Sequence, residues 1–78
     1  MQANLAEIKP GVRVQIIEVI GGSGKNSRLL DMGITPGTEV TVIAVHPFKG
    51  PIVVQMPGSQ IAIGRRIAHN ITVQSMDI

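Results

Sequence analysis

The sequence contains no cysteine, no tryptophan and no tyrosine, and Phe48 is its single aromatic residue. Without cysteine, neither a disulfide framework nor a thiolate metal site is available. Small secreted domains usually depend on disulfides, so we expect an intracellular protein in a reducing compartment. Single-stranded nucleic acids and proline-rich peptides bind to rows of aromatic side chains, and one phenylalanine does not form such a row.

Long apolar runs and strong charge are missing as well. No apolar stretch approaches the ~20 residues that cross a bilayer, and residues 1–11 lack the basic head and apolar core of a secretory signal. The net charge of +2 is a mild excess that does not indicate a nucleic-acid partner. A chain of 78 residues with 44% hydrophobic side chains is typical of one small globular domain. We therefore expect one domain over residues 1–78, located in the cytoplasm, with no cofactor.

Alternating apolar and polar residues predict two strands in which the pattern changes phase partway. In residues 12–20 the apolar side changes after Ile16, and in residues 38–46 it changes after Val42. A β-bulge or a sharply bent strand produces a change of this kind. Three shorter strands are predicted at 52–56, 60–63 and 71–74, with loops rich in proline and glycine at 46–51 and 57–59.

One helix is predicted between the first two strands, from Lys25 to Met32, with Ser23 as its N-cap. Gly33 ends this helix, because glycine readily takes the left-handed conformation that follows a helix. Residues 35–38, Thr-Pro-Gly-Thr, then predict a tight turn into the second strand.

These elements predict an all-β fold with one short helix, a small and partly open SH3-like β-barrel of about five strands. An OB-fold is the nearest alternative, since its length and strand number are similar. It usually carries its helix between the third and fourth strands, whereas the helix here falls between the first and second. We therefore favour the SH3-like barrel.

The stretch GGSGKNSRLLDMG, residues 21–33, looks at first like a phosphate-binding loop. A P-loop requires G-x-x-x-x-G-K-[ST], and aligning this motif on Gly24–Lys25 puts Val19 at the first glycine and Asn26 at the hydroxyl. Both differences remove groups that the chemistry needs. We interpret the stretch as a connector that leads into the helix, and weak anion binding near Lys25 stays open.

No catalytic or metal-binding motif is present. His46 and His69 are not spaced as paired ligands, and none of the serines lies in a G-x-S-x-G sequence. An enzyme and a dedicated metal site are therefore not expected. Arg65–Arg66 is the only basic doublet, and we interpret it as solvated surface.

A protein-binding module remains. Consecutive residues on a two-turn helix do not all face the barrel, so Met32 is expected to be partly exposed, and methionine suits contact surfaces. Phe48 and Lys49 at a loop tip form a second candidate. The predicted partner-binding residues are Arg28, Asp31, Met32, His46, Phe48 and Lys49.

The stretch RLLDMGITPGTEVTV resembles the ferrous iron transport protein A (FeoA) family. The hallmarks of that family are a basic residue, a leucine pair, a methionine or leucine followed by glycine, a Pro-Gly pair and a strand. They correspond to Arg28, Leu29–Leu30, Met32–Gly33, Pro36–Gly37 and Val40–Val42. The similarity continues through GVRV (11–14), HPFKGPIVV (46–54) and SQIAIGRRIAHNITV (59–73), so it covers nearly the whole chain.

The resemblance implies an SH3-like barrel that acts in the cytosol beside the large membrane ferrous iron permease, which carries a GTP-binding domain. It implies a non-enzymatic accessory or regulatory partner of that permease. The same barrel forms the C-terminal domain of the diphtheria-toxin-repressor class of iron-dependent regulators. Two alternatives stay open: a small nucleic-acid-binding barrel that uses Arg65–Arg66, and a ferrous-iron-sensing domain that uses His46 or His69. Self-association also stays open.

Overall fold

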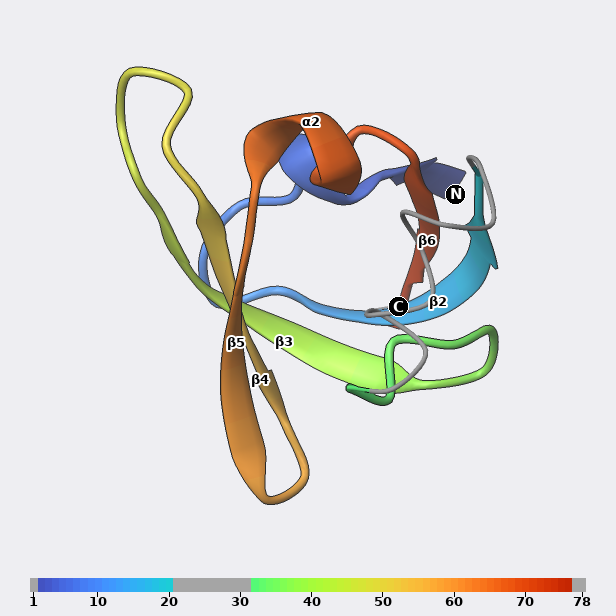
Figure 1. Cartoon of the computed structure of the whole chain (residues 1–78). Helices are drawn as coiled ribbons and strands as arrows, with labels where there is room; N and C mark the ends of the chain where they lie inside the picture. The colour runs from blue at the N-terminus through green and yellow to red at the C-terminus, as the bar shows by residue number, and fades with distance from the viewer. Residues whose placement is uncertain (1, 21–31, 77–78) are drawn as a thin grey trace.

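The computed structural model describes residues 2–20 and 32–76 of the chain. Within them, six strands form one antiparallel sheet in the order β1-β6-β2-β3-β4-β5, which curls around a core with short helices across one end (Figure 1). The mostly-β architecture predicted from the sequence is confirmed. The elements are β1 (Gln2–Asn4), η1 (Leu5–Glu7), β2 (Arg13–Val19), β3 (Glu39–Val45), β4 (Ile52–Met56), β5 (Ser59–Ile63), α2 (Arg65–Ala68) and β6 (Ile71–Ser75).

Both predicted phase changes are β-bulges. The pairing of β2 with β6 shifts register between Ile16 and Glu18, and the pairing of β3 with β4 shifts between Val42 and Ala44. Ile43 is the extra residue of the second bulge, and its side chain is 39% exposed although its neighbour Val42 is fully buried. A bulge bends its strand and increases the local twist, so both bulges help the sheet to curl.

The core consists entirely of apolar side chains: none of the buried residues in the described part of the chain is polar or charged. In β4, Ile52, Val54 and Met56 face inward and alternate with more exposed residues. Burying an aliphatic side chain of this size stabilises the fold by about 1.5–3 kcal/mol relative to leaving it in water. The core therefore supplies the main stabilisation of this small sheet.

The N-terminal segment contains a strand that the sequence pattern did not predict. This strand, β1, pairs with β6, from Gln2 opposite Gln74 to Asn4 opposite Thr72. Leu5 follows at the start of η1 and is fully buried. The burial of this one leucine holds the segment against the end of the barrel, where η1 contacts α2.

A second unpredicted element is α2, a single helical turn held by hydrogen bonds from Ala68 N to Gly64 O and from His69 N to Arg65 O. The helix that the sequence predicted at residues 25–32 lies outside the described residues except for Met32. No helix within the described ranges is both long and apolar enough to cross a membrane.

The tight turn predicted at residues 35–38 forms, and we call the segment from Gly33 to Thr38 the 33–38 turn. Gly33 and Gly37 have φ angles of +91° and +96°, a region that glycine adopts without strain. Thr38 N donates to Thr35 O at 3.1 Å, which closes the turn. Gly37 N also donates to Ile16 O at 2.7 Å, and this bond attaches the turn to β2.

Candidate functional site

The most unusual surface feature is the 46–50 loop, which connects β3 to β4. His46 N donates to Pro51 O at 3.1 Å, and Gly50 N donates to Pro47 O at 3.1 Å, so both ends of the loop are hydrogen-bonded. A Cβ atom at Gly50 would come within 2.8 Å of the His46 Cβ and 3.0 Å of the Pro47 oxygen. The loop is therefore closed so tightly that glycine is required at residue 50.

Two residues at the tip of this loop have strained backbones. Phe48 and Lys49 have φ angles of 58° and 60°, and they are the only non-glycine residues with positive φ in the described part of the chain. The left-handed conformation costs about 1–2 kcal/mol for a residue with a Cβ. Strain of this kind persists only where the surrounding structure enforces it, and it is concentrated at functional sites.

The Phe48 ring in this strained segment is exposed to solvent. Its side chain is 97% exposed, whereas the other exposed large hydrophobic residues of the described part, Ile20, Met32 and Ile43, reach 51%, 42% and 39%. The ring therefore gains no burial energy within the described structure that would offset the backbone cost.

Arg65 holds the loop in place from α2. Its Nε atom donates to Gly50 O at 3.2 Å and its guanidinium NH2 group donates to His46 O at 2.8 Å. Hydrogen bonds from a charged donor contribute more than neutral ones, about 1.5–3 kcal/mol before partial exposure reduces them. Arg65 thus fixes both ends of the loop to the helical turn.

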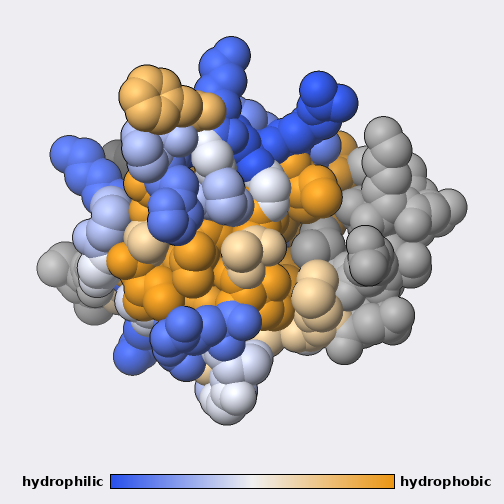
Figure 2. Space-filling view, turned by 60° about the vertical axis from the view of Figure 1, so that its left-hand side comes forward, coloured by the Kyte–Doolittle hydropathy of each residue, from blue (hydrophilic) through white to orange (hydrophobic). Residues whose placement is uncertain are grey.

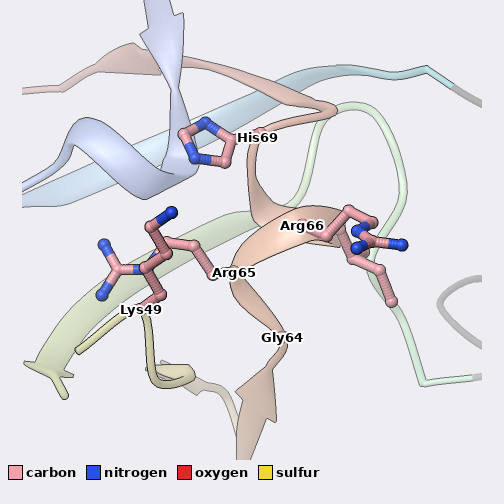
Figure 3. Close-up of a pocket in the computed structure, with 6 residues that line it drawn as sticks. Lys49, Gly64, Arg65, Arg66 and His69 are labelled. Carbon is pink, nitrogen blue, oxygen red and sulfur yellow. The ribbon is translucent and has the colours of Figure 1, made fainter. Parts of the chain in front are cut away.

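We call the two hydrogen bonds from Arg65 to the loop carbonyls the clamp. An open groove of about 770 Å³ lies beside it, between the loop and α2 (Figure 3). We call it the basic groove and define it by its lining residues Lys49, Gly64, Arg65, Arg66, Ile67 and His69. In Figure 3 the side chains of Lys49 and Arg65 lie on one side of it, Arg66 extends to the other, and His69 lies across from them. No acidic side chain is among the described residues that line the groove.

An apolar area lies next to the loop. In β4, Ile52 and Val54 face the core, so Val53 between them lies on the outer face of the sheet. Its neighbours on the adjacent strands, Ala44 and Ala62, lie on the same face. Figure 2, viewed from the side of β5 and the 46–50 loop, shows a continuous hydrophobic area with hydrophilic side chains above and below. Exposed apolar areas of this kind are typical of protein-binding surfaces.

The predicted partner-binding residues do not form one patch. Met32 is 42% exposed, in agreement with the expected partial exposure. It lies just before the 33–38 turn, whereas His46, Phe48 and Lys49 lie in the loop at the other end of β3, roughly 20 Å away at the rise of a strand. All three loop residues are exposed. Arg28 and Asp31 lie outside the described residues.

The described ranges contain no assembled metal site. No group of three or more histidine, aspartate or glutamate side chains lies close enough there to hold a metal ion. His46 and His69 are both exposed, and the glycine-rich stretch with Lys25 lies outside the described residues.

The role of Arg65 was missed in the sequence, where the doublet Arg65–Arg66 was interpreted as solvated surface. That interpretation fits Arg66, which is exposed. The hairpin of β4 and β5 pairs Ile52 with Ile63, so the chain that leaves β5 returns to the 46–50 loop. The apolar runs on both sides of the turn at 57–58 were the signal for this hairpin. Sequence reasoning therefore had the means to place residue 64 beside residue 51, although not to find the clamp itself.

Comparison with known proteins gives matches over nearly the whole chain. The model of the FeoA domain family matches residues 3–75. The "Putative Fe(2+) transport protein A" of Methanocaldococcus jannaschii is 37% identical over 73 residues, which cover 94% of this chain and 87% of the relative. Among solved structures, the crystal structure of an iron uptake regulatory protein (FeoA) superposes with a TM-score of 0.89 at 33% identity, covering 97% of this chain and 100% of the other.

More distant structures share the fold alone. A manganese-dependent transcriptional repressor in complex with manganese superposes with a TM-score of 0.86 at 22% identity, covering 96% of this chain but only 37% of the repressor chain. The predicted SH3-like fold is confirmed by the match to the iron uptake regulatory protein.

Proposed function

Because the chain belongs to the FeoA domain family, we propose that it is a non-enzymatic accessory protein of ferrous iron uptake. It acts in the cytoplasm, where it binds the GTP-binding part of the membrane ferrous iron permease and modulates transport. The family match over residues 3–75 is the observation that carries this proposal. The relative from Methanocaldococcus jannaschii, named as an Fe(2+) transport protein A, supports it.

The surface of the chain supports a role in binding. An exposed aromatic side chain on a rigid loop is well suited to anchor an interface, since aromatic residues are enriched among the contacts that dominate binding energy. Phe48 is such a residue, and Arg65 fixes the loop that carries it. We assign His46, Phe48 and Lys49 to the contact surface, with Met32 as a separate contact. Arg28 and Asp31 are assigned on the sequence pattern.

The test is a titration of the purified chain with the cytosolic GTP-binding part of the permease, followed by calorimetry, with GTP, with GDP and without nucleotide. Saturable binding is expected in at least one nucleotide state. The F48A variant should bind about fivefold or more weakly, because truncating an aromatic anchor costs about 1 kcal/mol or more.

The matched control is I20A, which shortens another exposed apolar side chain on a different part of the surface. Its affinity should stay within about twofold of that of the unmodified chain. If no nucleotide state produces binding, the permease is not the partner and the proposal fails.

A further inference from the structure

The basic groove carries positive charges that form no ion pair with any other described residue. The only ion pair between described residues joins Arg13 and Glu39, and neither of them lines the groove. The groove therefore presents the positive charges of Lys49, Arg65 and Arg66 together, with the ring N–H of His69 as a further donor.

The groove is concave, and this shape limits what can fill it. Its volume of about 770 Å³ lies within the range of pockets that enclose a ligand of several groups. A bilayer presents a flat surface of headgroups, which does not enter a hollow between a loop and a helical turn. A single strand of nucleic acid needs a row of aromatic platforms, and the residues that line the groove include no phenylalanine, tyrosine or tryptophan.

The groove also offers an apolar contact beside its charges. Ile67 lies in its wall and is partly buried. Phe48 precedes Lys49 in the 46–50 loop, so the loop that lines one side of the groove also carries the most exposed ring of the described chain. A binding partner that matches this surface carries carboxylates next to an apolar residue, because complementary charges and a buried anchor together define a specific contact.

We propose that the basic groove binds an acidic segment of a protein partner, with an apolar residue of that segment packed against Ile67 and Phe48. Lys49 and Arg66 pair with its carboxylates. Arg65 is a positioning residue, because its guanidinium donates to the carbonyls of His46 and Gly50 and so fixes the loop that forms one wall. The proposal rests on the proposed function, under which the acidic segment belongs to the cytosolic part of the permease.

The first experiment uses a probe that is independent of the permease. A short glutamate-rich peptide with one central leucine is titrated into the isotope-labelled full chain, and backbone amide shifts are followed by NMR. Shift changes are expected to be confined to residues 48–50 and 64–69 and to weaken as salt is added. The same peptide with glutamines in place of the glutamates should produce no saturable change.

The second experiment removes charge inside and outside the groove. The double variant K49Q/R66Q should bind the acidic peptide about tenfold more weakly. The matched control K9Q/R13Q loses the same charge at two exposed residues outside the groove, and it should bind within about twofold of the unmodified chain. All four substituted side chains are exposed, so both double variants should keep the dispersed amide spectrum of the folded chain.

The third measurement repeats this comparison with the permease domain and separates the two proposals. If the domain does not bind but the acidic peptide does, the groove assignment stands and the permease assignment fails. If the domain binds K49Q/R66Q as tightly as the unmodified chain, the groove assignment fails while the permease assignment stands.

Further results would overturn the groove assignment. One is equal loss of peptide binding in K49Q/R66Q and K9Q/R13Q, which would show attraction to the overall charge. Another is a DNA or RNA oligonucleotide, or a vesicle of phosphatidylglycerol, that shifts the same amides and displaces the acidic peptide.

Discussion

The 33–38 turn and the 46–50 loop lie at the two ends of β3, and they use positive φ angles in opposite ways. In the 33–38 turn the residues with positive φ are Gly33 and Gly37, which have no Cβ and are not strained by this conformation. In the 46–50 loop they are Phe48 and Lys49, whose Cβ atoms make the same conformation unfavourable.

Burial differs between the two regions in the same sense. The 33–38 turn places Ile34 in the core with no exposed surface, whereas the 46–50 loop places Phe48 outside with 97% of its surface exposed. The turn is therefore built to stabilise the fold. The 46–50 loop is strained because two exposed residues, Phe48 and Lys49, have positive φ angles. This strain lowers the stability of the fold, and such an arrangement is expected of a contact surface.

The largest expected effect compares these two hydrophobic side chains. I34A should lower the free energy of unfolding by about 3 kcal/mol, because it leaves a cavity in a fully buried site. F48A removes an even larger side chain but should change the stability by less than about 0.5 kcal/mol. Urea denaturation followed by circular dichroism measures both. A comparable loss in F48A would mean that the ring is buried in solution, and the contrast would disappear.

A smaller effect should isolate the backbone strain itself. A Cβ atom added at Gly37 meets nothing within 4 Å, so G37A introduces only the strain of a φ near +96° and should cost about 1–2 kcal/mol. Gly64 provides the matched control, because a Cβ there also meets nothing within 4 Å and its φ is −58°. G64A should be neutral or slightly stabilising in the same denaturation experiment. Equal losses in both variants would show that something other than φ determines the cost.

The same contrast separates what the sequence could predict from what it could not. The strands, both bulges and the 33–38 turn depend on local patterns: the apolar side of a strand, a change in its phase, and the Pro-Gly pair of residues 36–37. The bulges at Ile16–Glu18 and Val42–Ala44 were visible because a slip of one residue moves every following side chain to the other face.

The missing parts depend on contacts between distant segments. Residues 2–4 are too few to show alternation, and they form β1 only because Leu5 is buried and β6 offers a free edge. Four residues are likewise too few for a helical period, so α2 left no pattern to read. The clamp from Arg65 to the carbonyls of His46 and Gly50 requires the β4–β5 hairpin to be in place first. The basic groove could not be predicted either, because its lining residues come from two segments that only this packing brings together.

The smallest expected effect tests whether strain in the 46–50 loop is kept for binding. K49G should relieve the left-handed strain of about 1–2 kcal/mol but add the unfolded-state entropy of glycine, for a net gain of about 0.5–1 kcal/mol. The control K9G, at an exposed residue without positive φ, should only lose stability.

K49G also removes a groove charge, so its affinity for the acidic peptide should fall while its unfolding midpoint in urea rises. A protein that gains stability as it loses binding would show that this loop is optimised for contact and not for folding. If K49G and K9G lose stability equally, the loop carries no strain and the comparison with the 33–38 turn fails.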